Sequence, residues 1–199
     1  MVTMGRIMKI DEAVYTHEYL WRSSTYLLKN TVNSETDYRQ LIPSLLLAFL
    51  AYEAFINFLG HVLYPELWKD EKKNFKGKGL EGKVEAIVQR LPNAFTWKKG
   101  EQPYQAIKTL EEFRDMVSHG KVVTNKYASK QKEDGAHFCF QHDWDKFLTI
   151  SAIKSNRENI SKFVNELLVA ARSVSDEPHL VFEAFEGSLA HGEGMSING

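Results

Sequence analysis

The stretch that decides the fold is Ser44–Tyr64, SLLLAFLAYEAFINFLGHVLY. It is apolar on nearly every side, and a helix of that kind is buried at the centre of a helical protein. Glu53 and Asn57 are the exceptions, and they lie four residues apart on one face of the predicted helix. A buried carboxylate needs a cation or a proton, unless this edge of the helix faces water. The candidate cations for Glu53 are Arg114, Arg22 and His61.

Further helices are predicted on both sides of this stretch from the helical spacing of apolar residues. The predicted helices cover residues 11–30, 34–64 with a bend or a restart at Pro43, 80–91, 103–120 and 143–174. A turn or two more is expected in PELWKDEKK, residues 65–73. After the fourth helix we expect a loop or a small hairpin that pairs GAHFCFQ, residues 135–141, with residues 121–124. The sequence therefore predicts an all-α fold, an antiparallel bundle of about five helices with short connections.

Length and composition favour one soluble domain. A chain of 199 residues can bury a core without disulfides, and the single cysteine excludes an intramolecular one. Because no run approaches the ~18 to 20 consecutive apolar residues of a membrane span, we expect a cytoplasmic protein without a membrane partner. The helical domain is predicted over residues 1–175. Residues 176–199 form an acidic, Gly-rich tail that docks on the body or on a neighbouring subunit.

The net charge of −1 conceals an uneven distribution. Residues 66–132 hold 15 Lys and Arg against 9 Asp and Glu, a balance of +6, whereas residues 133–199 have a balance of −6. The middle third therefore either presents a basic surface to a polyanion or is a solvated Lys-rich loop.

The second informative stretch is Pro103–Gly120, PYQAIKTLEEFRDMVSHG. Pro103 is typical of a helix start, and Arg114 falls inside the apolar stripe of this helix. A guanidinium keeps its charge, so an inward Arg needs a carboxylate, an anionic ligand or a partner subunit. Gly120 is typical of the residue just past a helix end. His119 is then expected at the C-terminal cap, where its ring can turn back toward Arg114.

An Arg, four residues and a His at the exit of an amphipathic helix resemble the signature of the HEPN family of all-helical domains. The resemblance covers roughly Leu41–Lys121, including the long apolar helix, and Asp115 stands where Asn is the more familiar neighbour of the Arg. It implies a metal-independent endoribonuclease that uses no cofactor and cleaves RNA through the 2′-hydroxyl. It also implies a homodimer and a role in toxin–antitoxin regulation or phage defence, with an antitoxin or a nucleotidyltransferase as a further partner.

The resemblance gives each site residue a role. Arg114 would bind and polarise the phosphate, His119 would be the acid and base, Asp115 would orient one of them, and Glu53 would hold Arg114 between turnovers. The expected substrate-binding residues are Ser118, Lys121, Trp97, Lys98 and Lys99. Trp97 between lysines is able to stack on a base. Its other interpretation is a ring that closes one end of the bundle.

Two other functions remain open. The same cleft suits a non-catalytic module that binds a nucleotide or a protein, and the residues also suit a structural protein in which Arg114 and Glu53 form a buried ion pair. A metal site is not expected, because the spacing of the candidate ligands fits no common zinc module. Those candidates are His137, Cys139, His142 and Asp143.

Overall fold

The computed structural model describes residues 9–14, 16–31, 38–91, 95–120, 144–180, 183–185 and 190–195. Its helices and strands are β1 (Lys9–Val14), α1 (Thr16–Lys29), α2 (Tyr38–Leu63), α3 (Pro65–Lys69), α4 (Glu71–Asn74), α5 (Gly79–Val88), α6 (Tyr104–His119), the 3₁₀ helix η1 (Asp145–Phe147), α7 (Ile150–Arg172), the 3₁₀ helix η2 (Pro178–Leu180) and β2 (Ala190–Met195). The fold is an all-α helical bundle, which confirms the predicted class. Five of the α-helices have ten residues or more.

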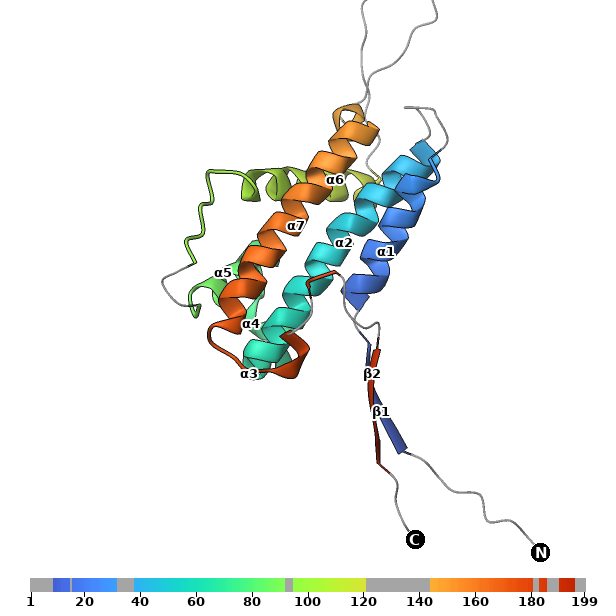
Figure 1. Cartoon of the computed structure of the whole chain (residues 1–199). Coiled ribbons are helices and arrows are strands. Elements are labelled where there is room, and N and C mark those ends of the chain that lie inside the picture. Colours follow the sequence, from blue (N-terminus) through green and yellow to red (C-terminus); the bar gives the residue numbers. More distant parts are fainter. Residues whose placement is uncertain are drawn as a thin grey trace, which may run out of the picture.

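Helix α2 is the centre of the bundle. It contacts α1, α3, α5, α6 and α7, and its side chains supply the deepest part of the core. In Figure 1, α1 and α7 lie on either side of α2, α1 runs antiparallel to α2, and α7 runs in the direction of α2 while α6 crosses behind them. The helix continues through Pro43, so the predicted alternative of a new helix beginning there is wrong. The nearly all-round apolar sequence is explained by this central place.

Two boundaries differ from the predictions. Residues 11–14, which we expected in the first helix, belong to β1, which pairs antiparallel with β2. The last helix begins at Ile150 and not at residue 143, because the Thr149 hydroxyl accepts a hydrogen bond from the Ala152 amide at 3.0 Å and caps the helix. The predicted loop or hairpin at residues 121–141 lies outside the described residues.

Asn57, a polar residue of α2, joins this helix to the short helices that follow it. Asn57 Oδ1 accepts hydrogen bonds from Lys83 Nζ at 2.8 Å and from Trp68 Nε1 at 3.4 Å, and Lys83 also pairs with Glu71. Gly60 gives Trp68 room, since a Cβ at Gly60 would lie 2.0 Å from the Trp68 ring. These contacts attach α3, α4 and α5 to the C-terminal half of α2.

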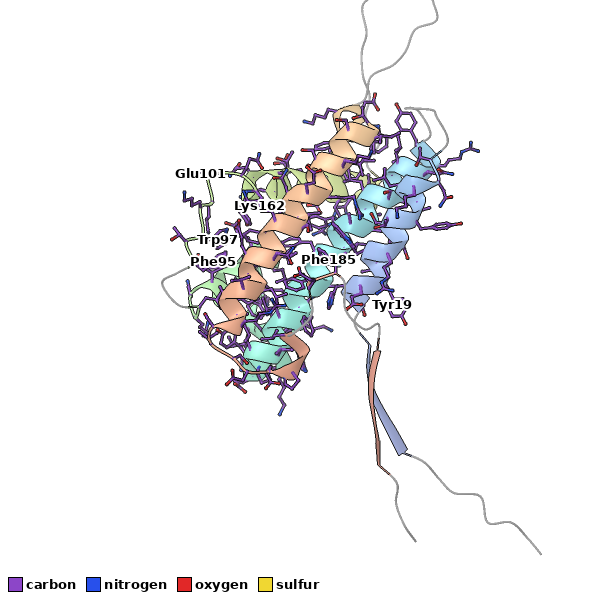
Figure 2. The ribbon with its side chains drawn as sticks, in the orientation of Figure 1. Tyr19, Phe95, Trp97, Glu101, Lys162 and Phe185 are labelled. Carbon is purple, nitrogen blue, oxygen red and sulfur yellow. The ribbon has the colours of Figure 1, made fainter. Side chains whose placement is uncertain are left out.

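Part of the C-terminal tail packs on the helices. Leu180 and Phe185 are buried, and the Phe185 ring stacks on Trp21 of α1 with a centroid distance of 4.1 Å. The tail was predicted to dock on the body of the chain or on a neighbouring subunit. In the structure Phe185 docks on the body of the same chain. Figure 2 shows Phe185 between α7 and α1.

Candidate functional site

The candidate site lies on the last turns of α6. Tyr104, Ile107, Leu110 and Phe113 bury one face of this helix, and Pro103 is its N-terminal cap. The helix ends at His119 because Gly120 takes a left-handed conformation, with φ 52° and ψ 32°. The predicted helix end and the positive φ of Gly120 are confirmed. His119 is exposed on the final turn.

Arg114 is held by carboxylates of its own helix. Its Nη1 lies 3.1 Å from Asp115 Oδ1, and its Nη2 lies 4.0 Å from Glu111 Oε1. The guanidinium carbon is 5.5 Å from the centre of the Phe49 ring, and Nε is buried with no hydrogen-bond partner in the described part of the chain. Burial raises the pKa of the Glu111 carboxyl, and the Arg114 charge opposes that rise. Two carboxylates of α6 therefore lie within 4.0 Å of the Arg114 guanidinium and neutralise its charge.

Glu53 does not hold Arg114. Within the described part of the chain Glu53 forms no ion pair at all, with Arg114, Arg22 or His61. The Arg114 guanidinium is paired instead with two residues of its own helix. Asp115 is its neighbour in the sequence, and Glu111 lies one turn before it on α6. Of the predicted acidic residues, only Asp115 is brought to Arg114.

Arg114 and His119 do not meet in one chain. Because α6 stays helical to His119, the two side chains leave the helix about 140° apart at ~100° per residue. Neither side chain makes a hydrogen bond to the other among the described residues, so the expected contact between the ring and Arg114 is not found there. Ser118 is exposed beside His119, and Lys121 lies outside the described residues.

The loop before α6 packs its Phe95 and Trp97 rings against the bundle. The Trp97 ring meets Tyr104 edge to face at 4.9 Å, and Lys99 Nζ lies 4.3 Å from the centre of the Trp97 ring. Lys99 also pairs with Glu81 at 3.0 Å, and its hydrogen bond lowers the pKa of the Glu81 carboxyl. Lys98 pairs with Glu101 at 3.3 Å. Trp97 therefore packs against the bundle, although along its side and not at the predicted end (Figure 2), and base stacking on the face that Lys99 covers would require Lys99 to move.

Sequence reasoning missed a shallow hollow beside this loop. It has a volume of about 690 Å³. It is lined by Phe95, Thr96, Lys162, Asn165, Glu166, Val169, Ala170 and Ser173. Figure 2 places Phe95, Trp97 and Lys162 on this side of the molecule. No local sequence signal marks it, because it is formed by two segments more than 60 residues apart.

Sequence reasoning also missed Arg157, which crosses from α7 to α1. Its Nη2 donates to Thr25 Oγ1 at 2.6 Å, its Nη1 donates to Ser24 Oγ, and its guanidinium carbon lies 3.8 Å from the centre of the Trp21 ring. Burial lowers the pKa of Arg157 to about 10. The only available sequence signal was an Arg in the polar middle of α7, which we expected to face water or to mark a bend.

Two further predictions meet the described residues only in part. Among the described residues, no group of three or more His, Cys, Asp or Glu side chains is placed to hold a metal ion. The four candidate ligands at residues 137–143 lie outside those residues. Helix α2 is long and apolar enough to cross a membrane by length and composition, although half of its most apolar window is buried inside the bundle.

Comparison of the chain with family models, with curated proteins and with solved structures found no match. An assignment of function therefore depends on the chain's own residues and their geometry.

Proposed function

We propose that the chain is a metal-independent endoribonuclease of the HEPN type that acts as a two-fold homodimer in the cytoplasm. One observation carries this proposal: α6 stops at His119 through the left-handed Gly120, which leaves an exposed imidazole just beyond a partly exposed Arg114. Those two side chains are the ones that RNA cleavage through a 2′-hydroxyl requires. A histidine exchanges protons near neutral pH, and an arginine fork matches the phosphate oxygens.

The proposed reaction uses the nucleophile that RNA carries. The imidazole of one protomer removes the proton of the 2′-hydroxyl, which attacks the neighbouring phosphorus, and the second protomer's imidazolium protonates the leaving 5′-oxygen. Arg114 stabilises the charge that develops on the non-bridging oxygens. The products are a 2′,3′-cyclic phosphate and a 5′-hydroxyl. Since Arg114 and His119 of one chain diverge, the partner chain is needed to complete a site with two histidines.

Asp115 takes the role that sequence reasoning gave to Glu53. In the free chain Asp115 and Glu111 hold the guanidinium, and an incoming phosphate would displace them. Control of such a nuclease by an antitoxin or a nucleotidyltransferase, and a place in toxin–antitoxin regulation or phage defence, are part of the proposal through the family resemblance alone.

The test is RNA cleavage by the purified wild type beside His119→Ala and His61→Ala. His61 is the matched control, because it is also an exposed histidine in the last turn of a helix, α2. We expect His119→Ala and Arg114→Ala each to lose at least ~10²-fold in rate, and His61→Ala to keep the wild-type rate. Cleavage should persist in EDTA and should stop on RNA with 2′-deoxy sugars. Equal rates for all variants would assign the cleavage to a contaminant or to another site.

The dimer is tested separately by light scattering at micromolar concentration, where a monomer would contradict the proposal. A cross-linked dimer whose two α6 ends lie on opposite outer faces would contradict it equally.

A second candidate function is a non-catalytic module that binds a nucleotide or a protein. The observation that favours it is the neutralisation of Arg114 by Asp115 and Glu111, which leaves the end of α6 without net positive charge. Binding without cleavage by the wild type, across several RNAs, would select this function.

A further inference from the structure

Helix α1 has two faces of opposite character. Toward α2 and α7 it presents His17, Glu18, Trp21 and Ser24, all buried or half-buried. Ser24 and Ser44 of α2 exchange hydrogen bonds, each hydroxyl donating to the other residue's carbonyl at 2.7 and 3.0 Å. This inner face fixes α1 on the bundle and leaves the opposite face of the helix directed to solvent.

The outer face of α1 carries aromatic and cationic side chains in alternation. The exposed residues on this side, which we call the α1 tyrosine face, are Tyr19, Arg22, Ser23, Tyr26, Lys29 and Asn30. At ~100° per residue these positions occupy a stripe about 120° wide. Tyr19 is 46 % exposed and Tyr26 68 % exposed, and Figure 2 shows Tyr19 pointing away from the bundle.

The tyrosine face carries Arg22 and Lys29, while the carboxylate of α1 lies buried behind it and pairs with Arg22. Glu18 is the only acidic residue of α1, and it is 3 % exposed, with its Oε2 3.7 Å from Arg22 Nη2. The Arg22 side chain remains 53 % exposed, and Lys29 extends from the last turn. A solvent-directed stripe with two tyrosines, two cations and no carboxylate is complementary to an anion that carries flat rings.

We propose that the α1 tyrosine face binds single-stranded nucleic acid, with bases stacked on Tyr19 and Tyr26 and phosphates beside Arg22 and Lys29. Rings and cations alternate about every 5 Å along the helix axis, at 1.5 Å per residue. Single-stranded nucleic acids also carry flat rings and negative charges along one chain, and their binding proteins pair aromatic platforms with cations. The surface is distinct from the end of α6, so binding here does not depend on cleavage.

Two other occupants fit less well. A second copy of this chain would bring like charges, Arg22 and Lys29, against each other. An acidic peptide would satisfy the cations but offers no repeated rings to the tyrosines. The alternation of both kinds of side chain selects the nucleic acid.

The experiment is fluorescence anisotropy with a short labelled oligouridylate carrying 2′-O-methyl groups, which removes the cleavage nucleophile and separates binding from catalysis. The double variant Tyr19→Ala/Tyr26→Ala is compared with Tyr19→Phe/Tyr26→Phe, which keeps both rings. Val169→Ala is the matched control, because Val169 is 64 % exposed on α7. Unchanged circular dichroism and melting temperature confirm that the variants fold.

We expect the double alanine variant to bind at least ~10-fold more weakly, and the double phenylalanine variant and Val169→Ala to bind as the wild type does. Lys29→Gln should lower the slope of log affinity against log salt by about 0.7. Inorganic polyphosphate, which has the charges without the rings, should compete poorly. Binding by the wild type without cleavage of ordinary RNA keeps this inference and ends the nuclease proposal.

Three results would overturn the inference. They are no binding by the wild type, unchanged binding by the double alanine variant, and displacement of the oligonucleotide by polyglutamate at equal charge concentration. The last result would identify an acidic protein as the partner of this face.

Discussion

Arg114 and Arg157 both lie over an aromatic ring of a neighbouring helix, yet the groups that surround their charges differ. Arg114 has two carboxylates within 4.0 Å, whereas Arg157 has two hydroxyls, an indole face and, in the described residues, no carboxylate. The Arg114 side chain is 26 % exposed, and the pKa of Arg157 is lowered by burial. Arg114, which belongs to the predicted functional motif, is therefore expected to contribute less to stability than Arg157, which belongs to no motif and joins α7 to α1.

The Arg157 contacts extend to the C-terminal tail. Phe185 stacks on Trp21 at 4.1 Å and Arg157 lies 3.8 Å from the centre of the same ring, so the two groups must occupy opposite faces of the indole. Parallel groups at such distances cannot share one face without overlap. One tryptophan therefore connects α1 to α7 and to the segment that follows it.

The largest expected difference between the two arginines is in stability. We expect Arg157→Ala to lower the free energy of unfolding by about 2 kcal/mol, through lost charge-assisted hydrogen bonds and the cation–π contact, less the desolvation that is relieved. Arg114→Ala should cost about 1 kcal/mol or less, because its ion pairs are partly exposed. Urea denaturation of both variants measures this. Equal losses would remove the distinction between the two sites.

The second prediction concerns stability at acid pH. It depends on His17, which contacts the Phe185 ring that stacks on Trp21. His17 lies against Phe55, Phe58 and Phe185, and burial lowers its pKa from 6.5 to about 4. The folded chain therefore binds fewer protons than the unfolded chain between these values. The contribution of His17 to the free energy of unfolding is fully present above pH 6.5. It falls as the pH drops toward 4, by at most about 1.4 kcal/mol per pH unit.

Urea denaturation across this pH range checks the second prediction. His17→Leu should flatten the curve between pH 6.5 and 4, and His61→Leu, at an exposed position, serves as the control. A wild-type curve that is already flat in this window would contradict a buried neutral His17.

The third prediction concerns the helix end beside Arg114. Gly120→Ala should cost about 1 kcal/mol, because φ is 52° and a left-handed backbone is unfavourable for a residue with a Cβ. Among the described residues no atom lies within 4 Å of the added Cβ, so the expected cost comes from the backbone. Gly100→Ala is the control, since its surroundings are equally open and its φ is not in the left-handed region. Equal melting temperatures for the two variants would mean that the end of α6 is not fixed by Gly120.

The smallest expected effect is that of Asp115→Asn on stability, less than about 1 kcal/mol. Its informative readout is binding of the uncleavable oligonucleotide, which should tighten as the Arg114 charge is released from its carboxylate partner. Glu112→Gln, an exposed residue of the same helix, removes one negative charge without touching Arg114 and serves as the control. Equal tightening by both variants would attribute the effect to net charge alone.

The sequence predicted the elements whose pattern is local. The central α2, the amphipathic α6 and its end at Gly120 follow from apolar periodicity and from the backbone freedom of glycine, and all are found. β1 was missed because its strand pairing depends on β2, about 180 residues away. The boundary at Ile150 was missed because Thr149 capping was not recognised.

The candidate site was predictable as a set of residues but not as a set of contacts. Periodicity places Arg114 near α2 but does not decide between Glu53 on α2 and Asp115 on its own helix, since that choice depends on side-chain rotamers and on how the helices cross. Arg157 was unpredictable for the same reason, because its partners Ser24 and Thr25 are more than 130 residues away.

The pairing of β1 with β2 also determines how the protein would respond to tension between its ends. Lys9 is opposite Met195 and Val14 is opposite Ala190, so the outermost pair is the first to bear a force that separates the two ends. The hydrogen bonds of an antiparallel pair are perpendicular to the strands, and a force applied in this way breaks them one pair after another at low load. Figure 1 shows both strands extending away from the helices. Mechanical load on the ends would therefore open the two strands before it reached the stacked Phe185 and Trp21.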